Sequence, residues 1–286
     1  MLTRNQIEFY QGQGYLLVPD VLDAQTVAEL RRVANQFVEK SGSVSTSNDM
    51  YDVGTGHTSE CPRLRRLKSP HLHHNVFDRV VRSDAVVDVV ASLVGPAVRF
   101  DHSKLNYKPK DASGVIEWHQ DWAFYPYTND DMLAVGVLIE DVTEDNGPMM
   151  VVPGSHKGPV FDHHDAGYFV GALNHEEVGF DASNAVTLTG KAGSITVHHV
   201  RTVHGSKENH TEENRPFLVI SYVAVDAWPL AQSYELAEFN ARILRGEPTL
   251  APRQVNLPVR IPLPKLSFSD SIYDDQDSVR GRSFGG

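Results

Sequence analysis

The segment Trp118-His119-Gln120-Asp121 places an imidazole and a carboxylate two residues apart. Side chains of an extended strand alternate between its two faces, so His119 and Asp121 would project together from one face. With a second, distant histidine they would form a 2-His-1-carboxylate facial triad, which is typical of non-haem Fe(II) oxygenases. The tripeptide alone also fits a surface histidine beside an acid, so this interpretation depends on the rest of the chain.

Three histidines near residue 200 are candidates for the distant ligand. We favour His204 over its rivals His198 and His199, because Gly205-Ser206 and the short spacing to Arg215 predict one hairpin that carries both side chains. A planar guanidinium binds a carboxylate through two parallel hydrogen bonds, so Arg215 would clamp a dicarboxylate beside the metal.

The composition limits what kind of metal site is possible. The chain has 14 histidines and one cysteine, so thiolate sites and internal disulfides are excluded, and any metal would be bound by imidazoles and carboxylates. The formal net charge of -11 argues against non-specific binding to nucleic acids. No apolar run is long enough to span a membrane, and the N-terminus lacks the apolar core of a secretory signal. We therefore expect a cytoplasmic protein with no nucleic-acid or membrane partner.

The elements that must position these residues are mainly strands. Capping residues and apolar spacing predict helices over 4–13, 24–40 and 85–93, and residues 41–60 form either a lid or a poorly packed connection. From about residue 98, short β-rich runs alternate with turn residues, as in an all-β sandwich or barrel. The expected strands are 15–18, 98–107, 114–118, 132–139, 149–152, 185–188, 194–198 and 217–225.

Five segments together resemble the phytanoyl-CoA dioxygenase family of Fe(II)- and 2-oxoglutarate-dependent oxygenases. They are LTRNQIEFYQGQGYLLVPDVL, LNYKPK, WHQDWAFYP, DVTEDNGPMMVVPGSHKG and HGSKEN with NRP, in the order of the family and spread over residues 2–216. The resemblance implies a double-stranded β-helix (jelly-roll, cupin-like) core, which agrees with the mainly β pattern. We expect one domain over 1–286: a mainly helical support and loop (1–95), the jelly-roll core (96–226) and a peripheral C-terminal segment (227–286).

Carried over to this sequence, the resemblance assigns Fe(II) to His119, Asp121 and His204. Arg215 would pair with the far carboxylate of 2-oxoglutarate, and Ser206 would assist it. With O2, the chemistry would be hydroxylation, or another oxidation, of an unactivated C–H bond with release of succinate and CO2. Related halogenases have Gly or Ala in place of the aspartate, so Asp121 disfavours halogenation.

The segment HSKLNYK supplies the next candidates for co-substrate binding. Alternation places Lys104, Asn106 and Lys108 on one face, and relatives use this strand to reach the co-substrate. We therefore predict co-substrate contacts from Lys104 and Asn106, with a solvent-facing strand edge as the alternative. The match departs from some relatives at Gly136, where they place a Trp, so the substrate of the family's namesake should not be assumed.

Candidate substrate residues are Trp122 and Tyr125, which follow the triad, and Arg66 in a basic cluster. The substrate is expected to be a small molecule, and the sequence does not name it or the oligomeric state. An alternative is a cupin-like Zn- or Mn-dependent hydrolase or isomerase with the same ligands. Such an enzyme would need no dicarboxylate clamp, so Arg215 and the Lys104/Asn106 strand favour the oxygenase. A non-enzymatic jelly-roll binding protein is disfavoured by the intact set of ligands.

Overall fold

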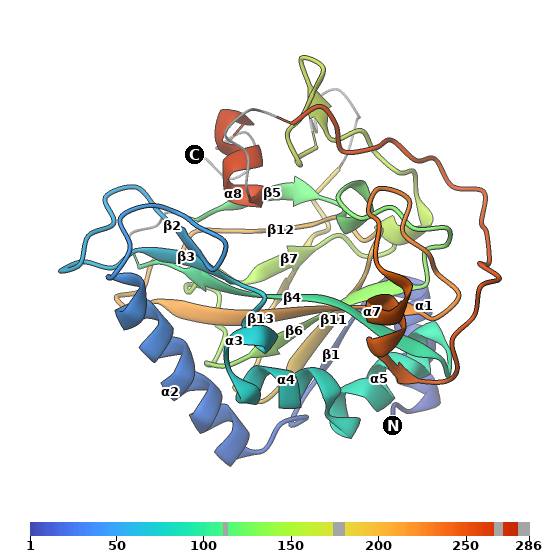
Figure 1. Cartoon of the computed structure of the whole chain (residues 1–286), viewed down its shortest axis with the longest axis horizontal. Coiled ribbons are helices and arrows are strands. Elements are labelled where there is room, and N and C mark those ends of the chain that lie inside the picture. The colour runs from blue at the N-terminus through green and yellow to red at the C-terminus, as the bar shows by residue number, and fades with distance from the viewer. Residues whose placement is uncertain (111–113, 174–180, 266–270, 280–286) are drawn as a thin grey trace.

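The computed structural model, which describes residues 1–110, 114–173, 181–265 and 271–279, contains two facing antiparallel sheets (Figure 1). The large sheet has the order β1 (Tyr15–Val18), β11 (Ile195–His199), β6 (Met132–Leu138), β13 (Arg215–Ala224), β4 (Val98–Lys108), β3 (Leu64–Lys68) and β2 (Tyr51–Val53), and β14 (Ile243–Arg245) also pairs with β4. The small sheet has the order β10 (Val186–Leu188), β7 (Met149–Val151), β12 (His204–Ser206) and β5 (Ile116–His119). A separate ribbon joins β8 (His164–Asp165) to β9 (Tyr168–Phe169). The predicted mainly β, jelly-roll fold is confirmed.

The helices within residues 4–94 cover the side of the large sheet that faces away from the small sheet (Figure 1). Thr3 forms a capping box with Gln6 at the start of α1, and Asp23 caps α2, as the sequence predicts. The helices are α1 (Arg4–Gln13), α2 (Ala24–Ser41), α3 (Pro70–His73), α4 (Asn75–Arg82), α5 (Asp84–Val94), α7 (Leu236–Ala241) and α8 (Ile272–Asp275), with 3-10 turns η1 (Asp121–Ala123), η2 (Ser155–Lys157) and η3 (Asp277–Val279). No helix in the described ranges is long and apolar enough to cross a membrane.

The main apolar core lies between these helices and the large sheet. Leu30 of α2 and Phe77 of α4 belong to the same buried cluster as Leu105 of β4 and Leu218 of β13. Because side chains alternate along each strand, burying these positions directs their neighbours toward the small sheet. Lys104, Asn106 and Lys108 of β4 therefore face the space between the sheets.

The register of the large sheet aligns the inward-facing side chains in rows. Asn106 pairs with Arg66 of β3 on one side and with Phe217 of β13 on the other. Arg215 pairs with Lys108 in the same register. One wall of the interior therefore carries a basic and polar surface built from three neighbouring strands.

Two expectations about this architecture are wrong. His204 and Arg215 do not share a hairpin, because β12 pairs within the small sheet and β13 within the large one. The C-terminal segment is not wholly peripheral, since Tyr273 of α8 is buried and the Gln276 side chain accepts a hydrogen bond from the Glu117 N–H of β5. Both errors arise because non-local pairing, which spacing does not reveal, decides these positions.

The turn at Gly14 fixes the approach to His204. Gly14 ends α1 with φ +79°, and its carbonyl accepts a hydrogen bond from Thr202 Oγ1 (2.7 Å). A Cβ added there would lie 2.3 Å from His156 Nδ1 and 2.6 Å from Thr202 Oγ1. We expect Gly14→Ala to lower the free energy of unfolding by about 2 kcal/mol or more, since the left-handed backbone alone costs about 1–2 kcal/mol.

Urea unfolding measures this effect, with Gly12→Ala as the matched control. Gly12 lies inside α1 with no neighbouring atom within 4 Å of the added Cβ. Replacing a helical glycine by alanine stabilises by about 0.5–1 kcal/mol. The two variants should therefore shift the unfolding midpoint in opposite directions, and a shift of the same sign would contradict the role given to the turn.

Candidate metal and co-substrate site

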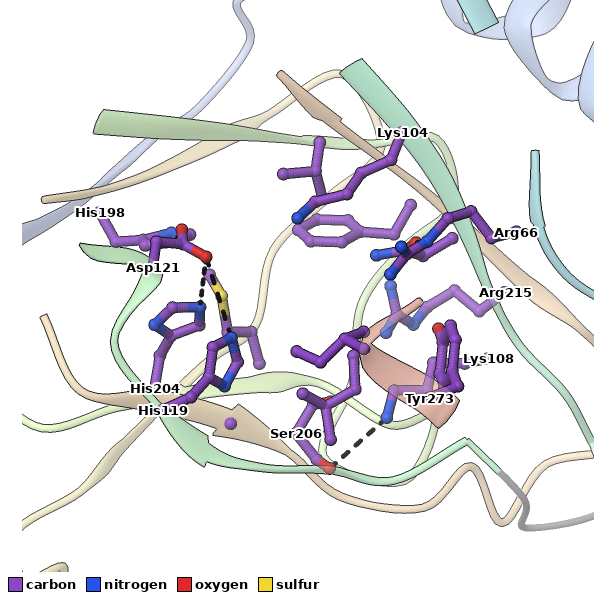
Figure 2. Close-up of a pocket in the computed structure, with 17 residues that line it drawn as sticks. Arg66, Lys104, Lys108, His119, Asp121, His198, His204, Ser206, Arg215 and Tyr273 are labelled. Atoms are coloured by element: carbon purple, nitrogen blue, oxygen red, sulfur yellow. Dashed lines mark hydrogen bonds and ion pairs between the residues drawn. The ribbon is translucent and has the colours of Figure 1, made fainter. Parts of the chain in front are cut away.

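His119, Asp121 and His204 meet at one edge of the space between the sheets (Figure 2). β5 ends at His119, η1 begins at Asp121, and the β5–β12 register sets His204 directly opposite His119. Asp121 Oδ1 lies 3.9 Å from Nε2 of each histidine, and one donor atom from each residue falls within a 4.8 Å cluster. These are the three residues that the sequence predicts as metal ligands.

Hydrogen bonds orient both imidazoles for metal binding. His119 Nδ1 donates to the Glu117 carbonyl (2.8 Å), and His204 Nδ1 donates to the Thr202 carbonyl (2.9 Å). A carbonyl only accepts, so each Nδ1 carries the proton and each Nε2 keeps a lone pair directed at the cluster. The residues present therefore fit a divalent ion.

The electrostatics of the cluster keep the three donors unprotonated. Burial lowers the pKa of His119 to about 4 and holds the pKa of His204 well below its usual value. Burial would raise the pKa of Asp121, but the neighbouring His204, the hydrogen bond from His198 and the Lys104 ammonium together hold it well below its usual value. Neutral imidazoles and an ionised carboxylate are the forms that bind metal.

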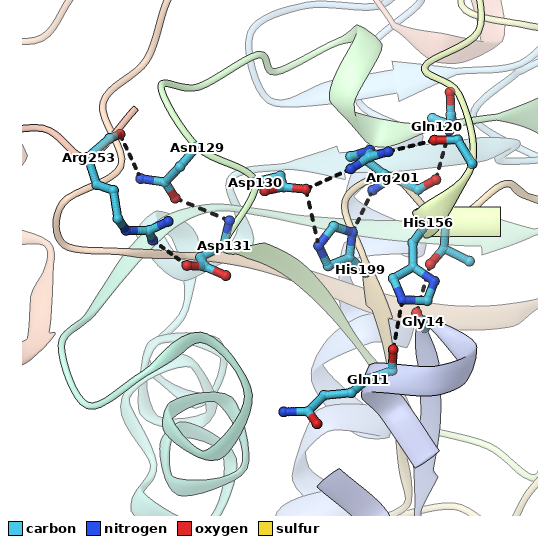
Figure 3. A network of polar contacts seen from close by, with 12 residues as sticks. Gln11, Gly14, Gln120, Asn129, Asp130, Asp131, His156, His199, Arg201 and Arg253 are labelled. Atoms are coloured by element: carbon cyan, nitrogen blue, oxygen red, sulfur yellow. Dashed lines mark hydrogen bonds and ion pairs between the residues drawn. The ribbon is translucent and has the colours of Figure 1, made fainter. Parts of the chain in front are cut away.

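The two rival histidines have different positions. His198 Nε2 lies 3.1 Å from Asp121 Oδ2, so it supports the carboxylate oxygen that faces away from the other two histidines. His199 lies outside the site in a polar network, where its Nε2 is 3.8 Å from Asp130 (Figure 3). Its Nδ1 accepts from the backbone of Arg201. Of the two, only His198 borders the cluster.

The cavity extends from this cluster to Arg215 and Ser206 (Figure 2). The Arg215 guanidinium is buried and donates to the carbonyls of Asn146 and Gly147 through Nε and Nη2, so its Nη1 has no partner among the described residues. Ser206 Oγ is also buried without a hydrogen-bond partner. An unpaired buried hydroxyl is costly unless a ligand satisfies it, and a carboxylate would fit both this hydroxyl and the free Nη1 of Arg215.

Lys104, Asn106 and Lys108 all line the cavity, as their predicted common face requires. Asn106 Oδ1 accepts from Arg66 Nε (2.9 Å), and the Lys108 ammonium donates to the carbonyls of Gly114 and Lys207. Burial lowers the pKa of Lys104 to about 8. The predicted contacts of Lys104 and Asn106 with a co-substrate stay predictions.

The predicted substrate residues separate into two groups. Arg66 and Tyr125 line a second compartment that shares Arg66, Lys104 and Asp121 with the first. The prediction that Trp122 contacts the substrate is wrong, because Trp122 lines neither compartment. It packs in another apolar cluster, and its Nε1 donates to the Pro258 carbonyl. The cause is the 3-10 turn at Asp121, which ends the strand alternation.

Sequence reasoning missed several cavity residues. Ile272 and Tyr273 come from α8, in the segment expected to be peripheral, and no spacing signal linked them to the site. Phe217 could have been found, since Arg215 lies two residues before it on the same strand face. A Cβ on Gly136 would lie 2.2 Å from Phe217 Cζ, so this ring occupies the space beside Gly136.

Known proteins are similar to this chain in sequence and in fold. The sequence model described as phytanoyl-CoA dioxygenase (PhyH) matches residues 10–217. The chain belongs to the phytanoyl-CoA dioxygenase family. A protein of Stutzerimonas stutzeri described as a probable alpha-ketoglutarate-dependent hypophosphite dioxygenase is 37% identical, over 98% of both chains. The ectoine dioxygenase of S. stutzeri strain A1501 is 24% identical over 77% of this chain and 76% of its own.

A solved structure of this family supports the same fold. EctD from S. alaskensis with bound Fe superposes with a TM-score of 0.69 at 25% identity, covering 89% of this chain and 88% of that one. The predicted membership of the phytanoyl-CoA dioxygenase family and its jelly-roll fold are confirmed.

Metal binding tests the assignment of the three ligands. The metal-free protein should bind one Fe(II) per chain in anaerobic titration calorimetry. His204→Ala should weaken binding more than about 100-fold, because loss of even an outer hydrogen-bond partner costs about 10–100-fold. His199→Ala is the matched control and should bind like the wild type. If His199→Ala lost Fe(II) binding and His204→Ala kept it, the assigned ligand would be wrong and His199 would be the metal ligand.

Proposed function

We propose that His119, Asp121 and His204 hold Fe(II), and that Arg215 and Ser206 hold the far carboxylate of 2-oxoglutarate. The chain is a non-haem Fe(II)- and 2-oxoglutarate-dependent dioxygenase of a small molecule. The observation that carries the site assignment is the joint presence, in one cavity, of a 2-His-1-carboxylate cluster, the Arg215 guanidinium with a free Nη1 among the described residues, and a buried Ser206 hydroxyl without a partner. We further propose that residues 1–286 form one catalytic domain. The cytoplasmic location and the absence of nucleic-acid and membrane partners stay predictions.

The bound iron and 2-oxoglutarate would supply the activation of O2, with one oxygen atom passing to substrate and the other to succinate as CO2 leaves. The chain's own residues orient these groups. The carbonyls of Glu117 and Thr202 fix the ligand imidazoles, and His198 supports the second oxygen of Asp121. The Arg215 side chain is held by two carbonyls, so its free N–H is directed before any ligand arrives.

A hydrolase or isomerase with the same ligands does not account for the far end of the cavity. Such an enzyme has no use for a guanidinium with a free N–H and a buried hydroxyl without a partner. The family relatives described above are named as dioxygenases, which favours the oxygenase.

Succinate formation tests the proposal. With Fe(II), ascorbate and 2-oxoglutarate, the wild type should form succinate even without substrate. Arg215→Ala should raise the KM for 2-oxoglutarate by about 30-fold or more, because removing one partner of a buried charged pair costs about 2–5 kcal/mol.

Arg253→Ala is the matched control for the lost guanidinium. Arg253 pairs with Asp226 at the surface, far from the cavity lining, and exposed pairs contribute little. It should form succinate at the wild-type rate. Absence of both 2-oxoglutarate binding and succinate in the wild type would overturn the proposed function.

A further inference from the structure

The second compartment is lined by two cations, Arg66 and Lys104, that form no ion pair with the acidic residues of its wall. Its wall contains Arg66, Lys104 and Tyr125 together with Phe124 and Phe169. It adjoins the cluster of proposed iron ligands, because Asp121, Arg66 and Lys104 line both compartments. Figure 2 shows the Lys104 side chain pointing into the cavity between Asp121 and Arg66.

Arg66 is held in place but is not satisfied. Its side chain is 9% exposed, its Nε donates to Asn106, and its guanidinium lies 5.3 Å from the centre of the Tyr273 ring. Its Nη2 is buried without a hydrogen-bond partner. A fixed, desolvated N–H with no acceptor indicates a missing oxygen.

Lys104 also lacks a hydrogen-bond acceptor among the described residues. Its ammonium makes no hydrogen bond or ion pair with any residue in the described ranges, and its Nζ lies 5.6 Å from the centre of the Tyr125 ring. Lys108, two residues along the same strand, shows the contrast, since carbonyl groups accept from its ammonium. Lys104 is therefore the inward-facing lysine of β4 whose ammonium lacks a hydrogen-bond acceptor in the described part of the chain.

Neighbouring carboxylates do not supply one. Asp101 pairs with His102 and accepts from the Tyr127 hydroxyl, and Asp275 lies 3.7 Å from Lys265. Asp121 belongs to the proposed metal cluster. With iron and 2-oxoglutarate bound, the charges of the ion, Asp121, the co-substrate and Arg215 would cancel one another, which leaves Arg66 and Lys104 in excess. Buried charges of one sign are costly without a counter-charge.

We propose that the substrate is a small oxyanion, or a small molecule with an oxyanion group, and that Arg66 and Lys104 bind that group. This inference rests on the proposed function and names the substrate class for the same site. Tyr125, Phe124 and Phe169 form the aromatic part of the wall, beside the ion pair of Lys265 and Asp275.

The position of the two cations also limits where oxidation occurs. Both residues border the compartment of the metal cluster, so the anionic group is bound beside that cluster. We therefore expect the oxidised X–H bond to lie close to the bound oxyanion group. In the balanced reaction, an X–H bond becomes X–OH, O2 and 2-oxoglutarate are consumed, and succinate and CO2 are released.

A probe panel with the full-length enzyme tests the class. Hypophosphite, methylphosphonate and acetate represent phosphorus and carbon oxyanions, and glycerol and choline are the neutral and cationic probes. Succinate formation with Fe(II) and 2-oxoglutarate should rise at least about 10-fold with one or more oxyanions and stay at the basal rate with glycerol and choline. The first three probes distinguish a phosphorus from a carboxylate group.

Variants at Lys104 test the receptor. Lys104→Met should raise the KM for the stimulating oxyanion about 30-fold or more, and Lys104→Arg should restore most of the affinity. Lys110→Met removes the same charge at an exposed position just beyond β4 and should behave like the wild type. Anaerobic calorimetry of the oxyanion into the Fe(II)–2-oxoglutarate form should show the same order of affinities without turnover.

The outcomes separate this inference from the proposed function. Stimulation by glycerol or choline alone, with normal basal succinate, would overturn the oxyanion class and leave the dioxygenase intact. A Lys104→Met variant that binds 2-oxoglutarate weakly but keeps the oxyanion response would return Lys104 to the co-substrate. Failure to bind 2-oxoglutarate or form succinate at all would instead overturn the proposed function.

Discussion

The pairing of β4 with β13 determines which side chains of the large sheet face the proposed metal cluster. Leu105 and Leu218 are buried on the helix side of the sheet, so Lys104 and Asn106 must face the cavity. A slip of one residue would exchange the two sets and place a lysine in the apolar core. The apolar packing of the helices against this sheet therefore fixes the chemistry of the opposite face, although no helix of that layer lines the cavity.

Buried donors without partners lie on both sides of the cavity, on β12 of the small sheet and on β3 of the large one. Ser206 Oγ and Arg66 Nη2 lack hydrogen-bond partners, whereas the equally buried Lys108 is surrounded by carbonyls. Leaving the hydrogen bonds of such groups unmade lowers the stability of the ligand-free protein. Ligands that satisfy them bind the folded state alone, so the cost is regained as binding affinity. The cavity is thus organised for anions at two places: beside Arg215, and between Arg66 and Lys104.

The sequence allowed the local parts of this site to be predicted, and long-range pairing decided the rest. The spacing of His119 and Asp121 and the alternation in β4 are local properties of a strand, and both side-chain sets face the cavity. The hairpin expected for His204 and Arg215 is wrong because their strands belong to different sheets. Tyr273 could not be found, since its place depends on the C-terminal segment returning to β5. The substrate contact predicted for Trp122 is wrong for a local reason, because a 3-10 turn stands where strand alternation was expected.

Gly136 and Phe217 together shape the cavity near Arg215. The Phe217 ring fills the space beside Gly136, so a larger side chain at position 136 would displace it. The same ring lies 5.3 Å from the Arg215 guanidinium, one strand repeat away. Position 136 therefore acts on the proposed carboxylate clamp through Phe217 as well as on the volume of the cavity. A tryptophan at position 136 would therefore need the Phe217 ring to move, which would change the aromatic contact of the guanidinium.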